Sequence, residues 1–356
     1  MTYALIGCGR VAPYHIAAAK KNGLEIIAVC DINEDAMQNL CISCGLGNEV
    51  LRFKSHKDLL ENIKPDLVAI ATESGSHGEI SKDVINAGCN IIIEKPISLS
   101  MKEAREIVSL CKEKGVVASA CHQNRFNIAI QKTREAMDEG RLGRISHGAI
   151  TVRWSRNRDY YAQDGWRGTW ENDGGALMNQ CIHGFDLLRW MLGGEIQEVY
   201  GVLRRQFHPY IEAEDVGMAV IKFKNGSVAT AEGTTNVFDS GLDTETLSIY
   251  GENGLIEIGG CSANEITRWS FKEKRQNDVE DKEITEKTKN VYGNGHITLY
   301  ADVVSAIKEG RAPYVTVEDG AAALELILAI YKSFKTCAPV SLPLGDFSTA
   351  EMKDVF

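Results

Sequence analysis

Runs of apolar residues in the first third of the chain alternate with segments of helical spacing. Five runs predict strands, at Tyr3–Ile6, Glu25–Cys30, Asp66–Ala71, Asn90–Ile93 and Val116–Cys121. Because these runs are almost wholly apolar, they are typical of a parallel sheet that is covered on both faces. Helical segments separate them, among them Val11–Asn22, Ser76–Ala87 and Ser100–Lys114. The succession predicts a doubly wound α/β domain over residues 1–121.

The pattern changes after residue 121. A helix around Ile128–Glu139 leads into a strand, Ile145–Trp154, and a second helix covers Gly175–Leu192. Alternating runs then predict further strands, at Glu198–Arg205, Val216–Phe223, Ser227–Glu232 and Glu245–Tyr250, and Asn225-Gly226 is typical of a hairpin turn. The last helix, Val317–Ser333, has apolar positions spaced for packing on a protein surface. Residues 122–356 therefore predict an α+β domain with an open, largely antiparallel sheet.

Length and composition support a two-domain globular protein. The chain has 356 residues, of which 44% are hydrophobic and 25% charged, and single cores stop growing at about 250–300 residues. Its formal charge of −10 disfavours binding to nucleic acid over a broad surface. No apolar run approaches the ~20 residues of a membrane span, and no secretory leader is recognisable. We expect a cytoplasmic protein without membrane contact.

The ten cysteines are too sparse for a disulfide scaffold, so we expect them to be reduced and structural. Cys41 and Cys44 form a CxxC pair on the predicted helix Glu34–Cys44. A redox pair or half of a zinc site is the alternative there, disfavoured because no second CxxC accompanies it. The eight histidines show no ligand spacing either, and the sequence predicts no metal site.

A glycine-rich turn follows the first strand and opens the first helix. The segment Gly7-Cys8-Gly9-Arg10-Val11-Ala12 fits G-x-G-x-x-A, in which glycines allow the turn and the close approach of a pyrophosphate to a helix N-terminus. Asp31 lies 22 residues after Gly9, where a carboxylate can bind both ribose hydroxyls of NAD. The same carboxylate would repel a 2′-phosphate, so NAD is predicted rather than NADP. A turn that binds nothing is the disfavoured alternative.

Polar residues follow two later strands, at the carboxyl ends where open sheets bind ligands. One segment runs from Ala71 to His77, and the other is Glu94-Lys95-Pro96. Lys95 is either an ordinary surface charge or a group that donates to a substrate oxygen beside the dinucleotide. Position alone does not separate these alternatives.

The helix that begins near Gly175 carries Asn179, His183 and Asp186 at the spacing of one face. A histidine on such a helix is often structural, but polar companions favour a base that accepts an alcohol proton. The preceding segment, Ser155–Glu171, is dense in cationic and aromatic side chains: Arg156, Arg158, Tyr160, Tyr161, Trp166, Arg167 and Trp170. It suits a substrate with a carboxylate or phosphate and a flat base or sugar face, and a buried oligomer interface is nearly as good an interpretation.

With these motifs the chain resembles the glucose–fructose oxidoreductase, inositol dehydrogenase and rhizopine-catabolism (Gfo/Idh/MocA) family. The resemblance rests on the glycine turn, Glu94-Lys95-Pro96, Gln123-Asn124-Arg125-Phe126, the helix Gly174–Asp186 and Ala329-Ile330-Tyr331-Lys332-Ser333. It implies a Rossmann domain, a dimer or tetramer packed through the second sheet, and oxidation of a sugar alcohol with Lys95 and His183 at the reacting carbon. The implied cofactor contacts are Gly7, Gly9, Arg10, Val11, Asp31, Thr72, His77, Glu94, Lys95 and Gln123.

A narrower likeness is to the UDP-N-acetyl-2-amino-2-deoxyglucuronate 3-dehydrogenases of bacterial surface-polysaccharide (lipopolysaccharide) synthesis. It is carried by Asp159-Tyr160-Tyr161, Gly165–Trp170, Gly174–Gln180, Asn264-Glu265-Ile266 and Val291–His296. The implied substrate contacts are Lys95, Asn124, Arg125, Arg156, Tyr160, Tyr161, Trp166, Arg167, Asn179, His183 and His296. Inositol-dehydrogenase-like members have Asp at the place of Asn179, whereas the narrower group shares the Asn. Glu73 also departs from the family, which usually has Pro there.

The leading hypothesis is therefore NAD-dependent oxidation of the C3 hydroxyl of UDP-N-acetylglucosaminuronic acid (UDP-GlcNAcA) to the 3-keto sugar. His183 is the expected base and Lys95 the donor to the alkoxide, and the reverse assignment is the alternative. The resemblance also suggests 2-oxoglutarate as an acceptor that reoxidises bound NADH, and a homotetramer. A dehydrogenase of a free sugar or inositol is the second hypothesis. A regulator that binds NAD without turnover is the third.

Overall fold

The chain forms two compact units in the computed structural model, which describes residues 1–276, 278–287 and 293–356. Unit 1 comprises Met1–His122 and His296–Ala321, and unit 2 comprises Gln123–Gly295 and Ala322–Phe356. These are not the two contiguous ranges expected from the sequence, because a late segment of the chain belongs to unit 1. The reason is packing: Tyr300 of that segment places its hydroxyl 2.9 Å from the hydroxyl of Tyr3 on the first strand.

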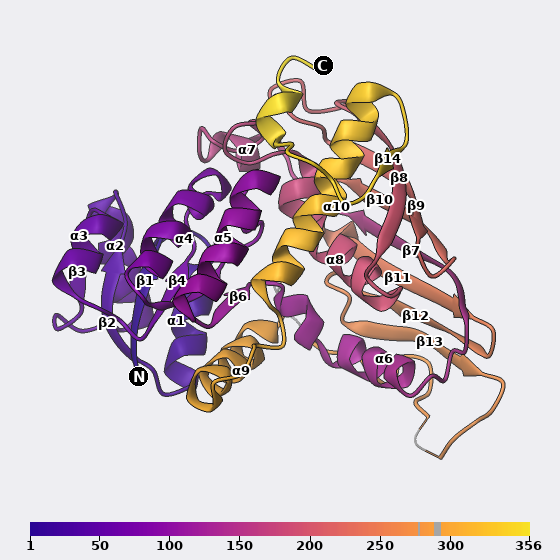
Figure 1. Ribbon diagram of the computed structural model, residues 1–356, viewed down its shortest axis with the longest axis horizontal. Helices are drawn as coiled ribbons and strands as arrows, with labels where there is room; N and C mark the ends of the chain where they lie inside the picture. Colours follow the sequence, from indigo (N-terminus) through magenta and orange to yellow (C-terminus); the bar gives the residue numbers. More distant parts are fainter. Residues whose placement is uncertain (277, 288–292) are drawn as a thin grey trace. The chain divides into compact units, whose positions relative to one another are not determined.

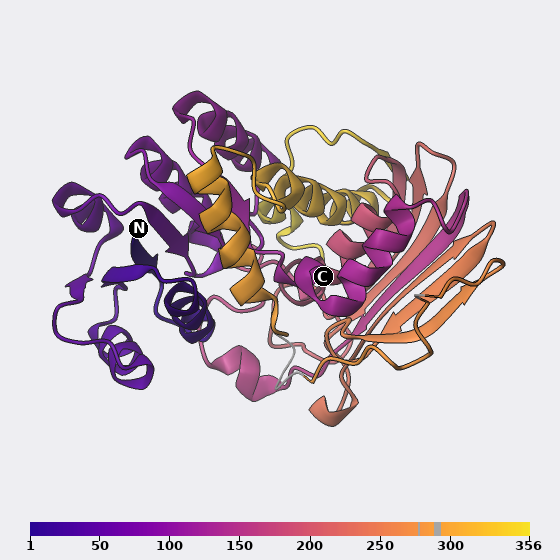
Figure 2. The same cartoon turned by 90° about the horizontal axis from the view of Figure 1, so that it is seen from below.

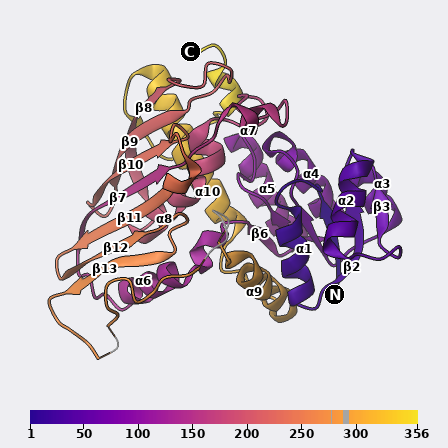
Figure 3. The ribbon, with the colours of Figure 1, turned by 180° about the vertical axis from the view of Figure 1, so that it is seen from behind.

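Unit 1 contains a six-stranded parallel sheet with the order β3-β2-β1-β4-β5-β6. Figure 1 labels all of its strands except β5, and Figure 3 shows the ribbon from behind. Its strands are β1 (Thr2–Ile6), β2 (Glu25–Cys30), β3 (Leu51–Phe53), β4 (Leu67–Ile70), β5 (Asn90–Ile93) and β6 (Ala118–Ala120). Every residue of β4 is buried, as expected for a sheet covered on both faces. The order reverses between β1 and β4, which is the switch point where such sheets bind ligands.

The helices of unit 1 are α1 (Ala12–Lys21), α2 (Glu34–Cys44), α3 (His56–Asn62), α4 (His77–Asn86), α5 (Met101–Lys114) and, from the late segment, α9 (Gly295–Glu309). Side-chain caps begin α2 and α3, whereas α1, α4 and α5 have none. At α2, for example, the Asn33 side chain accepts the N–H groups of Asp35 and Ala36, and Gly45 ends the helix in the left-handed conformation. The sequence analysis predicted α1, α2, α4 and α5, but not β3, α3 or α9.

Unit 2 is built on an eight-stranded sheet with the order β13-β12-β11-β7-β10-β9-β8-β14. Its strands are β7 (Ile145–Arg153), β8 (Ile196–Arg204), β9 (Val216–Phe223), β10 (Val228–Thr234), β11 (Thr244–Gly251), β12 (Gly254–Gly259), β13 (Glu265–Phe271) and β14 (Val340–Ser341). Only β7 and β10 pair in parallel. The expected open, largely antiparallel sheet is thereby confirmed. The sequence analysis missed β12, β13 and β14.

One face of this sheet is covered by helices. They are α6 (Ile128–Asp138), α8 (Ile182–Met191) and α10 (Val317–Thr336), which lie on the same side of the strands in Figure 2. Burial along β9 alternates residue by residue, so the strand presents one apolar face to these helices and the other to the surface. The predicted hairpin is present, with Gly226 at a φ of +89° between β9 and β10.

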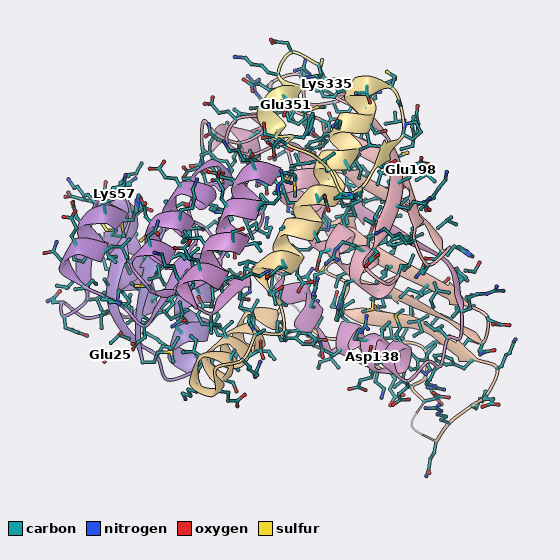
Figure 4. The ribbon with its side chains drawn as sticks, viewed as in Figure 1. Glu25, Lys57, Asp138, Glu198, Lys335 and Glu351 are labelled. Carbon is teal, nitrogen blue, oxygen red and sulfur yellow. The ribbon has the colours of Figure 1, made fainter. Side chains whose placement is uncertain are left out.

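The surface of both units is charged. Lys57 lies 3.5 Å from Glu79 in unit 1, and Lys222 lies 2.7 Å from Glu198 in unit 2, with Lys57 and Glu198 labelled in Figure 4. Such exposed pairs contribute only about 0–1 kcal/mol each. Among the helices that the structure describes, none is both long and apolar enough to cross a bilayer. All ten cysteines are free thiols.

Candidate active site

The glycine turn joins β1 to α1 with a geometry that only glycine allows at its first position. Gly7 has a φ of +97°, and a Cβ there would lie 2.4 Å from the carbonyl carbon of Ala71. Gly9 and Arg10 are exposed, and a Cβ at Gly9 would meet no described atom within 4 Å. Val11 is the N-cap of α1 and has no polar atom to cap it. The N–H groups of Ala12 and Tyr14 already donate to the backbone carbonyls of Gly9 and Val11, so the open space at Gly9 and the positive end of the helix dipole are what suit an anion such as a pyrophosphate.

Asp31 ends β2 beside this turn. Its Oδ2 accepts the backbone N–H of Cys8 at 2.7 Å, and its Oδ1 accepts that of Asn33 at 2.8 Å. The carboxylate is thus fixed against the turn and remains partly exposed. The neighbouring side chain, Ile32, is 90% exposed and apolar, so it offers no charge to a 2′-phosphate. The turn and Asp31 together fit NAD.

His77 links the two loops that follow β4 and β5. Its Nδ1 lies 2.6 Å from the carbonyl oxygen of Pro96, and its Nε2 lies 3.2 Å from that of Thr72. The ring is fully buried, and burial lowers its pKa. The Thr72 hydroxyl accepts a hydrogen bond from Ser76 at 2.8 Å. The sequence analysis predicts His77 as a cofactor contact. In the structure its two ring nitrogens face carbonyl oxygens of both loops, so the buried ring positions the loops.

Glu94 and Lys95 follow β5. The Glu94 Oε1 lies 3.0 Å from His15 Nε2, and its Oε2 accepts the backbone N–H of Lys95 at 3.1 Å. Burial disfavours the charged carboxylate, but the interactions with His15 and His296 outweigh it and hold the pKa of Glu94 well below its usual range. Lys95 is half-buried, and its peptide bond to Pro96 is cis. The pair places a buried anion directly before a cationic side chain at the ligand-binding edge.

His296 lies in the interior of unit 1, at the start of α9. Its Nε2 is 3.8 Å from Glu94 Oε1, and its ring packs edge-on against His15 with centroids 5.5 Å apart. Burial lowers its pKa. The motif that suggested a substrate contact begins with Val291 and Tyr292, which lie outside the described residues. The described geometry instead places His296 beside Glu94.

The segment Gln123–Phe126 forms a short 3₁₀ helix in unit 2, and its first three residues are buried. Arg125 donates from Nε and Nη2 to the two oxygens of Asp186, both at 2.7 Å, and its guanidinium lies 4.7 Å from the ring centre of Trp190. This is a buried structural ion pair, and it does not support the predicted substrate contact of Arg125. The amide of Asn124, in contrast, has no hydrogen-bond partner among the described residues.

The helix that carries His183 begins with a π turn over Leu177–Cys181, and α8 follows it. A π turn is wider than an α turn, and Asn179 lies within it, whereas His183 and Asp186 lie three residues apart within α8 and share a face of that helix. Asp186 is completely buried with Arg125, whereas Asn179 is partly exposed. His183 is 7% exposed, one helical turn beyond Asn179.

A polar network joins the aromatic loop to the π turn in unit 2. The Tyr160 hydroxyl accepts hydrogen bonds from Arg167 Nη1 and Gln180 Nε2, both at 2.8 Å. Arg156 Nε donates to Gln180 Oε1 at 3.0 Å, and the Asn179 side chain bonds Gln180 and Asp173. Sequence reasoning missed Gln180, although it lies in a quoted motif.

Both arginines of this network also face carboxylates. Arg156 lies 3.7 Å from Asp243, and Arg167 Nε donates to Asp164 at 2.9 Å. Their guanidinium groups stack on aromatic rings, with Arg167 4.4 Å from the ring centre of Trp166. No sequence signal pointed to Asp243, which is distant along the chain. The network is therefore rigid and nearly charge-balanced before any ligand binds.

Tyr161 differs from its neighbour Tyr160. It is 9% exposed, and its hydroxyl lies 3.1 Å from that of Thr235. Burial raises its pKa. The ring packs against His208 and Tyr210. The predicted substrate contact of Tyr161 is thus a core residue of unit 2, and Tyr160 is the half-exposed member of the pair.

Comparison with known proteins identifies both units. Residues 1–122 match the model "Oxidoreductase family, NAD-binding Rossmann fold", and residues 134–342 match "Oxidoreductase family, C-terminal alpha/beta domain" of the Gfo/Idh/MocA group. The WlbA dehydrogenase of Bordetella pertussis, solved with NADH and UDP-GlcNAcA, is 32% identical over 96% of this chain and 99% of its own, with a TM-score of 0.85. The WlbA dehydrogenase of Chromobacterium violaceum, solved with the same ligands, is 34% identical over 97% of this chain and 96% of its own, with a TM-score of 0.87. The scyllo-inositol 2-dehydrogenase (NAD(+)) of Bacillus subtilis is 25% identical over 95% of both chains.

Proposed function

This chain belongs to the Gfo/Idh/MocA family of oxidoreductases and is an NAD-dependent dehydrogenase, and we propose that it oxidises the C3 hydroxyl of UDP-GlcNAcA to the 3-keto sugar. The observation that carries the proposal is the similarity, at 32% and 34% identity over nearly the whole chain, to two dehydrogenases solved with NADH and UDP-GlcNAcA. The inositol dehydrogenase of B. subtilis is more distant, at 25% identity.

The cofactor is assigned to the switch point of unit 1. Gly7 and Gly9 shape the turn for the pyrophosphate, the backbone at Arg10 and Val11 leads into the N-terminus of α1, and Asp31 accepts the ribose hydroxyls. NAD supplies the acceptor for the hydrogen that leaves the sugar carbon. Thr72 and Lys95, which follow β4 and β5, extend this edge of the sheet. Gln123 is the remaining proposed cofactor contact.

Lys95 and His183 are the proposed catalytic residues. His183 accepts the proton of the C3 hydroxyl through its imidazole, and the ammonium of Lys95 hydrogen-bonds the oxygen as it gains negative charge. A positioned acid or base of this kind contributes about 10²–10⁴ in rate. The reverse assignment, with Lys95 as the base, uses the same two groups. A Lys95→Ala variant should lose turnover, and a variant that binds NAD normally yet turns over at the wild-type rate would contradict the mechanism.

Unit 2 supplies the proposed substrate contacts. Asn179 and Tyr160 are partly exposed members of the polar network, and Asn124 presents an amide whose hydrogen-bonding groups are unsatisfied among the described residues. The guanidinium groups of Arg156 and Arg167 lie 5.2 and 4.7 Å from the ring centre of Tyr160, and Arg167 also stacks on Trp166. Both arginines and Trp166 are proposed to face the uronate or diphosphate. Because the network is already hydrogen-bonded, a bound substrate would meet donors that need little reorganisation.

The test is to follow NADH absorbance with purified protein, NAD and UDP-GlcNAcA, with and without 2-oxoglutarate. A rise in NADH, or 3-keto sugar formed only with the oxoacid present, supports the proposal and separates released from retained cofactor. No reaction under either condition, with NAD binding measured separately, would overturn it. His183→Ala is the matched control that should remove any sugar-dependent signal.

A dehydrogenase of a free sugar or inositol is the second candidate. Two observations favour it: the relative from B. subtilis, and the carboxylates of Asp243 and Asp164 that already face Arg156 and Arg167. The same assay with inositols in place of the nucleotide sugar tests it. If this candidate holds, Arg156→Ala should hardly change the Michaelis constant, because a free polyol has no anionic group to contact it.

We further propose a cytoplasmic homo-oligomer, a dimer or tetramer, that serves lipopolysaccharide sugar synthesis. The open face of the unit 2 sheet supports the oligomer. Four apolar side chains pair across β8 and β9 on this face: Tyr200, Val202, Met218 and Val220, which are 43%, 43%, 53% and 51% exposed. Sedimentation should show an oligomer that a Met218→Lys variant weakens, whereas a wild-type monomer would contradict it.

A further inference from the structure

Four side chains of metal-binding type meet inside unit 1. They are His15 on α1, Glu94 after β5, Cys121 after β6 and His296 on α9. One ligand atom from each lies within 4.8 Å of all the others, and all four residues are buried. The sequence predicted no metal site because these residues are far apart in the chain and show no short ligand spacing.

The donor set has the chemistry of a zinc site. Two imidazoles, one carboxylate and one thiolate make four donors, the number that Zn²⁺ takes in closed tetrahedral sites. The two anionic donors would balance the charge of a divalent cation in the interior. Zinc bonds of ~2.0–2.3 Å place tetrahedral ligands ~3.3–3.8 Å apart, so the cluster needs to contract by only about 1 Å.

The surroundings of the two histidines orient them for this role. His15 has its Nδ1 2.7 Å from the hydroxyl of Tyr300, which itself lies 2.9 Å from that of Tyr3. Such a partner on one ring nitrogen fixes the other, here Nε2, toward a metal. His296 is 4% exposed, and neither of its ring nitrogens has a hydrogen-bond partner among the described residues. Its Nε2 is 3.8 Å from Glu94, so it is a buried donor directed at the cluster.

We propose that His15, Glu94, Cys121 and His296 bind one Zn²⁺-type divalent cation as a closed structural site. With four protein ligands the site leaves no position for a substrate, so the cation supports the fold. It would join α1, the ends of β5 and β6, and α9, which tethers the late segment to the rest of unit 1. It would also fix the Glu94 carboxylate whose Oε2 holds the backbone N–H of Lys95.

Cobalt substitution tests the proposal without using the dehydrogenase reaction, so its failure is distinct from failure of the proposed function. The full-length protein is freed of metal with a chelator and titrated with Co²⁺, and the near-ultraviolet thiolate-to-cobalt band is recorded. Metal content per chain is measured before and after. We expect one cobalt per chain, a thiolate band in the wild type, and loss of that band in Cys121→Ser.

The control is Cys41→Ser/Cys44→Ser, which removes the CxxC pair of α2 and should leave the band intact. His296→Gln is the second variant, and it should lower the bound cobalt at least tenfold in apparent affinity even where Cys121→Ser folds poorly. Absence of stoichiometric metal, a band that survives in Cys121→Ser, or a band that the CxxC variant abolishes would each overturn the site.

Discussion

At the scale of a single residue, the carboxylate of Asp31 serves the fold and is proposed to serve the cofactor as well. It accepts N–H groups of Cys8 and Asn33, so it shapes the glycine turn, and it is partly exposed, as the proposed contact with the ribose requires. The spacing from Gly9 predicted the role toward the cofactor. The role in the glycine turn depends on the hydrogen bonds of the folded chain.

Variants of Asp31 separate the two roles. Asp31→Ala should weaken NAD binding by about 1.5–3 kcal/mol, because a charged hydrogen-bonding group is lost, and should reduce the preference for NAD over NADP. Asp31→Asn keeps acceptors for the N–H of Cys8 and should be intermediate. Calorimetric dissociation constants measure this, with Asp35→Ala, an exposed neighbour, as the control. An unchanged constant in Asp31→Ala would show that the cofactor is placed wrongly.

At the scale of elements, the glycine turn between β1 and α1 contains two glycines with different physical demands. Gly7→Ala should destabilise the protein, because its Cβ would lie 2.4 Å from the backbone of Ala71 at a φ of +97°. Gly9→Ala should leave thermal stability unchanged, since no described atom lies within 4 Å of its Cβ, and should weaken NAD binding because the Cβ occupies the approach of the pyrophosphate. Melting temperature and NAD affinity are measured for both. Equal losses of stability in the two variants would contradict the different roles given to Gly7 and Gly9.

A buried ion pair joins the 3₁₀ helix Gln123–Phe126 to α8 and stabilises the contact between these two elements. Arg125 and Asp186 have side-chain exposures of 1% and 0%. Asp186→Asn should lower the free energy of unfolding by about 3–5 kcal/mol, because it leaves a buried guanidinium without its counter-charge. Denaturant unfolding followed by tryptophan fluorescence measures this loss. Asp138→Asn, from an exposed pair with Arg134, should cost at most about 1 kcal/mol, and similar losses in both variants would refute the structural role.

At the scale of the whole molecule, two buried carboxyls make stability depend on pH. Burial raises the pKa of Glu214 and that of Glu245 to about 8, from an ordinary value of 4.5. Neither oxygen of Glu245 has a hydrogen-bond partner among the described residues. Between pH 4.5 and about 8 the unfolded chain has lost protons that the folded chain keeps, so the free energy of unfolding falls as pH rises.

Each carboxyl contributes a slope of at most about 1.4 kcal/mol per pH unit in that window. Glu245→Gln should flatten the decline of the melting temperature from pH 5 to 8, because the neutral amide cannot ionise. Glu25→Gln, at an exposed position of β2, is the control and should follow the wild type. A decline that is equally steep in Glu245→Gln would mean that Glu245 does not titrate as its burial indicates.

Much of the fold was accessible from the sequence because it is encoded in local patterns. Apolar runs separated by helical segments predicted the strands β1, β2, β4, β5 and β6, and the turn chemistry at Gly7 and Asn225-Gly226 predicted where the chain reverses. The family and its cofactor followed from motifs that are contiguous in the chain. The roles of Lys95 and His183 remain predictions at this level.

The tertiary structure decided what depends on contacts between distant residues. Packing of Tyr300 on Tyr3 assigned α9 to unit 1, and the partner of Arg125, which no spacing predicts, turned a presumed substrate contact into a buried ion pair. His15, Glu94, Cys121 and His296 meet only because the strands and helices that carry them pack together. Sequence patterns record how each element forms, whereas the free energy of burial and pairing across the chain selects which side chains meet.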